Sequence, residues 1–188
     1  MRTADVLRVT LAAGAVVLLA AGCNSTVDGE PTTQGDGETS AGSPAAVEVF
    51  NPCEMSDATL TSVGLDPATK DVSIDPPSGP STWRVCAWKP LDKSETYRVD
   101  VFSTSHTLDE ARKNENLTVV SDVTIGGREG ITSYDKNDSK RDRCYATFAA
   151  EQGMFEIAAT WRGDSSDMPD MCTIAVDQAT KLEPHLPE

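Results

Sequence analysis

The chain has 188 residues, 38% of them hydrophobic, which is enough for one compact domain with tails. Asp and Glu number 30 against 16 Lys and Arg, so the formal net charge is −14 at pH 7. A body this acidic repels nucleic-acid phosphates and anionic lipid headgroups. The charge therefore excludes a nucleic-acid partner, and it excludes membrane attachment through a basic patch.

The N-terminal segment has the features of a bacterial lipoprotein signal. Arg2 and Arg8 form a short basic start, and residues 9–22 are uncharged and apolar. This run is shorter than the ~20 residues of a membrane-spanning helix but typical of a signal-peptide core. Small residues then lead directly to Cys23. We therefore expect residues 1–22 to be removed and Cys23 to become a lipid-modified N-terminus. Two or three acyl chains on this residue would anchor the protein stably.

The residues after Cys23 predict a tether followed by a folded domain. Residues 24–46 are rich in Ser, Thr, Gly, Pro and acidic residues, and they contain almost nothing that a core could bury. Such a composition predicts disorder. The expected organisation is a signal peptide at 1–22, a lipidated N-terminus and disordered tether at 23–46, and one disulfide-stapled α+β domain at 47–188. The expected location is the outer face of the cytoplasmic membrane.

Four cysteines remain once Cys23 is assigned to the lipid: Cys53, Cys86, Cys144 and Cys172. In an exported chain an even number of cysteines predicts disulfides, and four cysteines allow three connectivities. We favour Cys53–Cys86 with Cys144–Cys172, because sequential pairing closes two moderate loops and gives each half of the domain its own staple.

The folded domain is expected to open with a short helix. Ser56 is its candidate N-cap, and Gly64 its terminator. Leu60 and Val63 would lie on its inner face. Residues 66–82 contain four Pro residues and one Gly, and they predict a long loop.

Two strands and a second helix follow. Residues 83–88 and 97–102 alternate in character as strands do. Thr107 is the expected N-cap of a helix over 107–114, because acidic residues occupy its first turn, where the helix dipole favours them.

The second half of the domain predicts two hairpins and a final helix. The segments are strands at 119–125 and 128–134, strands at 144–148 and 154–161, and a helix from about 168 to 182. Gly126 and Gly127 suit a tight two-residue turn. The final helix keeps apolar residues at helical spacing.

These segments predict an α+β fold. We expect an antiparallel sheet built from two or three hairpins, with about three helices packed on one face. The order strand, strand, helix occurs twice, which would fit a duplicated ββα unit.

An ordered set of short motifs resembles a known family. The motifs are NPC at 51–53, GL at 64–65, RVCAW at 84–88, YRVDV at 97–101, GGREG at 126–130, and then Cys144 and Cys172. Together they resemble the actinobacterial lipoprotein family called domain of unknown function 3558, over about residues 48–187. The resemblance implies export, lipidation and paired cysteines, and it implies no activity.

No pattern of residues predicts catalysis. His106 lies near Ser103, Ser105 and Asp109, but a strand end followed by a helix cap explains this stretch better than a Ser-His-Asp triad does. The glycines at 126–130 match no nucleotide-binding motif. We therefore expect no enzymatic activity and no cofactor.

Metal binding is not expected either. Asp135, Asp138 and Asp142 lie in one loop, but Lys and Arg residues are interleaved with them. The loop also lacks the Gly and Glu of an EF-hand. No cysteine or histidine spacing is typical of a zinc site.

Trp83, Trp88 and Trp161 are the candidates for a hydrophobic contact patch, because Trp is enriched among binding hot spots. Trp83 and Trp88 would point to opposite faces of their strand.

We expect a non-enzymatic, lipid-anchored extracytoplasmic domain that binds an envelope protein or a small ligand. Two alternatives stay open. One is an inhibitor of an envelope or extracellular hydrolase. The other is an enzyme acting on cell-wall material, which predicts a cleft with clustered acids.

Overall fold

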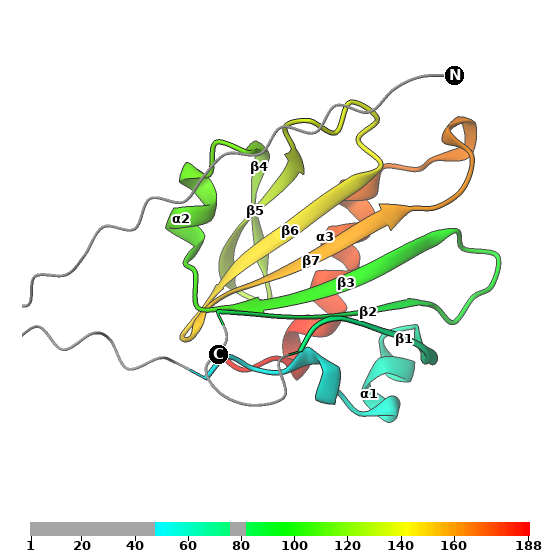
Figure 1. The fold of residues 1–188 in the computed structure, drawn as a ribbon, viewed down its shortest axis with the longest axis horizontal. Coiled ribbons are helices and arrows are strands. Elements are labelled where there is room, and N and C mark those ends of the chain that lie inside the picture. The colour runs from blue at the N-terminus through cyan, green and yellow to red at the C-terminus, as the bar shows by residue number, and fades with distance from the viewer. Residues whose placement is uncertain (1–47, 76–81) are drawn as a thin grey trace, which may run out of the picture. The chain divides into compact units, whose positions relative to one another are not determined.

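Seven antiparallel strands form one sheet in the computed structural model (Figure 1). The structure describes residues 48–75 and 82–188. The strands are β1 Leu65–Ile74, β2 Trp83–Pro90, β3 Tyr97–Thr104, β4 Leu117–Ile125, β5 Arg128–Asp135, β6 Arg143–Ala150 and β7 Gly153–Trp161. Their order across the sheet is β1-β2-β3-β7-β6-β5-β4. The expected antiparallel sheet is present, and it is larger than two or three hairpins. The predicted signal peptide, Cys23 and the tether lie outside the described residues.

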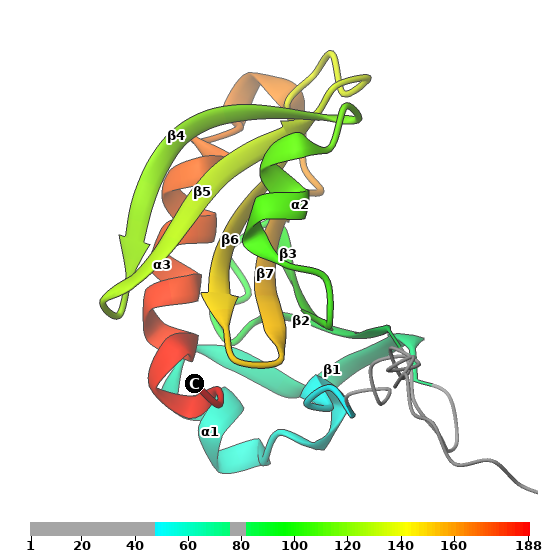
Figure 2. The same cartoon turned by 90° about the vertical axis from the view of Figure 1, so that its left-hand side faces the viewer.

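The α-helices are α1 Asp57–Ser62, α2 Leu108–Lys113 and α3 Met171–Leu182, and the 3₁₀ turns are η1 Pro52–Glu54, η2 Ser165–Asp167 and η3 Glu183–His185. The expectation that the helices share one face is wrong, because α2 and α3 lie on opposite faces of the sheet (Figure 2). Met171 and Ala175 of α3 are buried in the main core. Leu108 and Ala111 of α2 belong to a separate small cluster with Met154. We call the two sides the α3 face and the α2 face.

The repeated order of two strands and a helix is present as β2-β3-α2 and β6-β7-α3. The two units are not copies in space, because their helices pack on opposite faces and differ in length, with 6 residues in α2 and 12 in α3. Alternate side chains of a strand point to opposite faces. The same order of two strands and a helix therefore allows the helix to pack on either face of the sheet.

Strand β1 replaces the first part of the loop that the sequence predicts over 66–82. It is an edge strand that pairs only with β2, and its register shifts between Asp66 and Asp71. Asp66 accepts a hydrogen bond from the Ala68 amide at 3.0 Å, which is typical of a turn. Pro67 is tolerated because the strand lies at an edge. An exposed, irregular edge strand buries no alternating apolar face, and this is why its pattern does not stand out.

Helix α3 begins later than the sequence predicts. The expected start was near residue 168, but the first helical residue is Met171. The Asp170 side chain accepts a hydrogen bond from the Cys172 amide at 3.0 Å and so provides the N-cap.

Several local predictions are confirmed. Ser56 caps α1, and Thr107 caps α2 through a capping box with Glu110. Gly126 and Gly127 form the two-residue turn between β4 and β5, with φ of 58° and 92°, which few residues other than glycine adopt readily.

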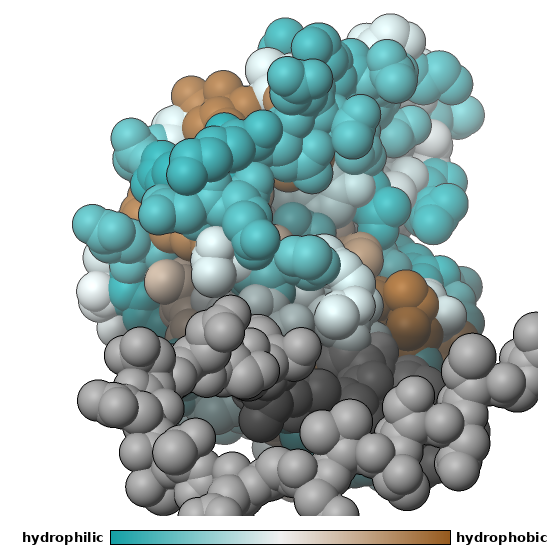
Figure 3. Space-filling view, turned by 60° about the vertical axis from the view of Figure 1, so that its left-hand side comes forward, coloured by the Kyte–Doolittle hydropathy of each residue, from teal (hydrophilic) through white to brown (hydrophobic). Residues whose placement is uncertain are grey.

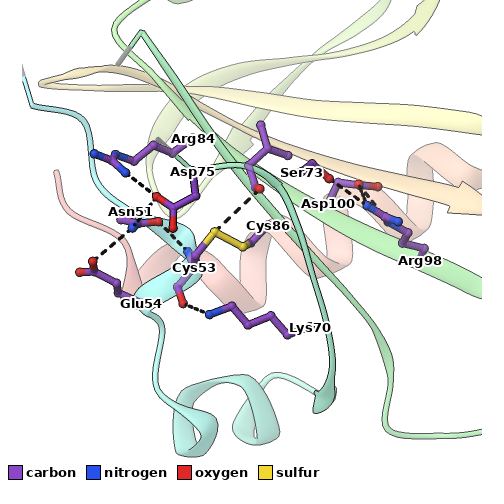
Figure 4. Close-up of a disulfide and its surroundings, with 11 residues drawn as sticks. Asn51, Cys53, Glu54, Lys70, Ser73, Asp75, Arg84, Cys86, Arg98 and Asp100 are labelled. Atoms are coloured by element: carbon purple, nitrogen blue, oxygen red, sulfur yellow. Dashed lines mark hydrogen bonds and ion pairs between the residues drawn. A yellow bond between two sulfur atoms is a disulfide. The ribbon is translucent and has the colours of Figure 1, made fainter. Parts of the chain in front are cut away.

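Both disulfides have the sequential pairing that the sequence favours, Cys53–Cys86 and Cys144–Cys172. The first joins η1 to β2 (Figure 4). Asn51 Oδ1 accepts a 3.0 Å hydrogen bond from the Cys53 amide, and Lys70 Nζ donates one of 2.5 Å to the Cys53 carbonyl. The second disulfide ties β6 to α3, so the sheet and its long helix are covalently joined.

Candidate functional site

The α2 face of the sheet carries polar and aromatic side chains at its centre. Phe102, Glu156 and Thr147 are paired across β3, β7 and β6, so they share this face. Ile157, the next residue on β7, lies in the main core on the α3 face. The side of the molecule on which α2 lies is mostly hydrophilic, with separate hydrophobic groups (Figure 3). A polar α2 face therefore lies opposite an apolar α3 face.

A pocket of about 420 Å³ lies between α2 and this face of the sheet, and we call it the α2 pocket. Met154, Tyr145 and Glu156 line it from strands β6 and β7. Trp83 lines it from the start of β2, and His106 lines it from the turn that follows β3. The pocket is thus built by elements that are far apart in the sequence.

The remaining wall comes from α2 and the residues around it. Glu110 and Ala111 belong to α2, Asn114 and Leu117 follow it, and Asp135 ends β5. The lining therefore contains three carboxyl groups, one imidazole and two large aromatic rings. No Lys or Arg is among the lining residues described.

Glu156 is the buried acid of the α2 pocket, with 7% of its surface exposed. Thr147 Oγ1 donates a 3.1 Å hydrogen bond to its carboxyl. Burial raises the pKa of Glu156 to about 7, and the opposing influences of Thr147 and the Arg143 charge are smaller. Near neutral pH its carboxyl therefore exists in both forms, and it either donates or accepts a hydrogen bond.

Tyr145 lies beside Glu156 and is held at both ends. Its hydroxyl donates a 2.7 Å hydrogen bond to Asp135. The Arg143 guanidinium lies over its ring at 5.1 Å, and over the Phe102 ring at 5.6 Å. Burial raises the pKa of Tyr145, and the hydrogen bond to Asp135 raises it further. Its hydroxyl therefore remains a hydrogen-bond donor.

Trp83 and His106 form an aromatic wall. Their ring centroids are 5.6 Å apart, and the rings are tilted by 35°. His106 Nδ1 lies 3.4 Å from a Glu110 carboxyl oxygen. The same carboxyl accepts the Thr107 amide hydrogen at 2.7 Å, and this backbone hydrogen bond lowers the pKa of Glu110. Glu110 therefore contributes a negative charge at the rim of the pocket.

A buried polar cluster continues the α2 face beyond the pocket. Asp100 is 4% exposed, and it forms ion pairs with Arg98 at 2.8 Å and Arg143 at 3.4 Å. The Thr160 hydroxyl and Arg143 Nε are buried and have no hydrogen-bond partner among the described residues. The cluster fixes Arg143 beside Tyr145, on the polar side of the sheet.

The three tryptophans considered for a contact patch lie in different surroundings. Trp83 lines the α2 pocket, whereas Trp88 is 1% exposed and belongs to the main core. Their opposite orientation on β2 is confirmed. Trp161 packs against the main core, and its Nε1 donates a 2.8 Å hydrogen bond to the Asp164 carbonyl. Core packing thus accounts for two of the three.

Glu156, which lines the pocket, and its hydrogen-bond partner Thr147 were not predicted as site residues. Glu156 and Thr147 are polar residues inside otherwise apolar strand segments. A lone acid at a strand position expected to be buried is the signal that could have found Glu156. The sequence predicts Asp135 to lie in a loop, and its proximity to Tyr145 depends on strand pairing that spacing does not reveal.

Over residues 48–75 and 82–188, no group of three or more His, Cys, Asp or Glu side chains is arranged to hold a metal ion. Within the same ranges, no helix combines the length and apolar character needed to cross a bilayer.

Comparison with known proteins gives one match. A search of curated proteins and a search of solved structures each found no match. The model of the family described as "Protein of unknown function (DUF3558)" matches residues 18–185, which is most of the chain and agrees with the resemblance seen in the sequence motifs. The chain therefore belongs to the DUF3558 family.

Proposed function

We propose that this protein is a lipid-anchored extracytoplasmic binding domain of the bacterial cell envelope, and that it holds a small ligand in the α2 pocket. The observation that carries the proposal is a concave pocket with an aromatic wall and a buried carboxyl, Glu156, whose pKa is raised to about 7. Pockets of this size with a few convergent polar groups are typical of small-molecule sites. Perturbed pKa values cluster at functional sites.

The location at the envelope rests on the sequence and on the disulfides. The apolar leader and the small residues before Cys23 favour lipidation. Two disulfides in a domain of this kind favour an oxidising compartment.

The distribution of exposed apolar side chains supports a pocket rather than a large protein-binding patch. Val72 and Ile74 lie on one edge strand, β1, and Val119 and Val120 lie on the other, β4. They therefore cannot form one continuous surface, as a hydrophobic interface core would require.

Ligand binding is tested with the full-length chain, processed in a lipoprotein-producing bacterium, and a panel of amines, amino acids, sugars, cell-wall fragments and fatty acids. We expect at least one compound to raise the melting temperature. Asn114→Trp fills the pocket mouth and should abolish that rise. Lys113→Trp is the matched control, because Lys113 is the exposed last residue of α2, next to Asn114, and does not line the pocket. If no compound stabilises the protein, or if Asn114→Trp responds like Lys113→Trp, the proposed pocket function is wrong.

A second candidate is an enzyme that acts on cell-wall material. It is favoured by one observation, since a buried carboxyl that titrates near neutrality is suited to general acid catalysis. Glu156→Gln keeps the shape of the side chain and removes the acid. The enzyme hypothesis predicts that the wild type releases soluble fragments from purified cell walls and that Glu156→Gln does not. If the wild type releases none, the pocket is a binding site only.

A further inference from the structure

The charges around the α2 pocket are one-sided. Three carboxyl groups line it, from Glu110, Asp135 and Glu156, and His106 is the only basic side chain among the lining residues described. The whole chain carries a formal net charge of −14. Both the local and the long-range fields therefore attract cations.

The carboxyl group of Glu156 is buried and has few partners that could stabilise a negative charge. It forms no ion pair within the described part of the chain, and one hydroxyl, that of Thr147, is its only hydrogen-bond donor there. The base that acts on it through charge is Arg143, which is engaged with Asp100 at 3.4 Å and with the rings of Tyr145 and Phe102. A buried carboxylate without a paired cation is unfavourable.

The other groups around Glu156 do not supply that cation. Asp135 on β5 is negative, and Tyr145 on β6 is neutral because burial raises its pKa. On the side of α2, Glu110 is negative, and the His106 imidazole lies against that same carboxyl, with Nδ1 at 3.4 Å from it. At neutral pH and above, a ligand is the most direct source of a compensating positive charge.

Aromatic and apolar side chains line the other side of the pocket. Trp83 and Met154 line the pocket together with His106. An indole face packs against apolar groups and also attracts cations. The lining therefore combines an apolar side with an acidic side, which matches a ligand that has both characters.

We propose that the α2 pocket takes a small organic cation, an amine or guanidine with an apolar part, whose charged nitrogen lies against Glu156 and whose apolar part lies against Trp83 and Met154. This inference rests on the proposed small-ligand function and names the class of ligand.

A pH dependence follows from this arrangement. The cation prefers the ionised carboxyl of Glu156, so binding at neutral pH releases a proton from it. Affinity should therefore increase as the pH rises from 6 to 8.

The test uses three probes of similar shape and different charge: 2-phenylethylamine, 2-phenylethanol and 3-phenylpropionate. Titration calorimetry with the full-length chain at pH 8 should show the amine binding about tenfold or more tightly than the alcohol, since a charge-assisted hydrogen bond replaces a neutral one. The carboxylate should bind least. Glu156→Gln should remove the preference for the amine and most of the increase in affinity between pH 6 and 8. Glu129→Gln, at an exposed position outside the pocket, is the matched control and should keep both.

The outcomes separate this inference from the proposed function. If the alcohol or the carboxylate binds as tightly as the amine, the pocket binds small molecules but not as a cation site. If Glu156→Gln keeps the full preference for the amine, the assignment of the charged nitrogen to Glu156 is wrong. If none of the three probes binds, the cation inference is overturned, and the compound panel with Asn114→Trp decides separately whether the pocket binds any small molecule.

Discussion

Thr147 and Glu156 lie opposite each other on β6 and β7, and the Thr147 hydroxyl donates a 3.1 Å hydrogen bond to the Glu156 carboxyl. One hydroxyl replaces only part of the hydration that a carboxylate loses on burial. Burial therefore raises the pKa of Glu156 to about 7, although the hydrogen bond from Thr147 works in the opposite direction. The pair places a group that titrates near neutrality inside the sheet.

Replacement of this acid should change how the stability depends on pH. The pKa of Glu156 rises from 4.5, the reference value, to about 7 in the folded protein. Because the folded state holds the proton more tightly, ionisation of Glu156 lowers stability progressively as the pH rises from 4.5 to 7, and the loss is constant above that range. Glu156→Gln should remove this decrease. We expect the free energy of unfolding of the variant to exceed that of the wild type by roughly 1–3 kcal/mol more at pH 8 than at pH 4.

Urea titrations at pH 4, 6 and 8 measure this difference. Glu129→Gln, which changes an exposed residue, should show the same pH profile as the wild type. Parallel profiles for the wild type and Glu156→Gln would show that folding does not raise the pKa of Glu156, and the account of the site would have to be revised.

The sequence predicts the elements whose signals are local. Thr107 and Glu110 form a capping box within four residues, and Gly126 with Gly127 defines a turn by backbone conformation alone. Strand β1 was missed because it is held by pairing with β2 rather than by its own apolar pattern. The side of the sheet on which each helix packs was not predictable either, since α2 buries only Leu108 and Ala111.

The site was predicted less well than the fold, for a related reason. Residue type alone favours the three tryptophans, of which two pack in or against the core. The α2 pocket depends on register, because Phe102, Glu156 and Thr147 meet only through the pairing of β3 with β7 and of β7 with β6. Contacts between strands that are distant in the sequence leave no short-range pattern.

Gly126 and Gly127 should differ in their tolerance of a side chain. Gly126 has φ of 58°, and a Cβ there would overlap the Glu183 carboxyl, which forms a 2.9 Å ion pair with Arg128. Gly127 has φ of 92° and open space around it. Gly126→Ala should therefore combine backbone strain with the loss of a partly buried ion pair and lower the free energy of unfolding by about 2–3 kcal/mol.

Gly127→Ala is the matched control, with an expected cost of about 1 kcal/mol from backbone strain alone. Guanidinium unfolding followed by tryptophan fluorescence compares the two. Equal losses would mean that the Glu183 side chain moves aside at no cost and that its ion pair with Arg128 contributes nothing.

The Cys144–Cys172 disulfide should be a main source of stability, because it ties β6 to α3 across 28 residues of chain. In the loop-closure model a link of this length stabilises the fold by about 3–4 kcal/mol. Replacing both cysteines by alanine should lower the free energy of unfolding by that amount. The Cys53–Cys86 pair closes a loop of similar length, with a separation of 33, so its double variant should lose a similar amount. An unchanged denaturation midpoint in either double variant would contradict this account.

Cys23→Ser should abolish acylation of the protein without changing the fold of its domain. If Cys23 carries acyl chains, the wild type should remain in the membrane fraction after a high-salt wash, because salt screens charges and leaves lipid insertion intact. The variant should lack incorporated labelled palmitate, and its denaturation midpoint should match that of the wild type. The double variant of Cys53 and Cys86 is the control, since it removes two other cysteines and should stay in the membrane fraction. Incorporation of labelled palmitate by Cys23→Ser would locate the acylation elsewhere in the chain, and the proposed route to the envelope would then be wrong.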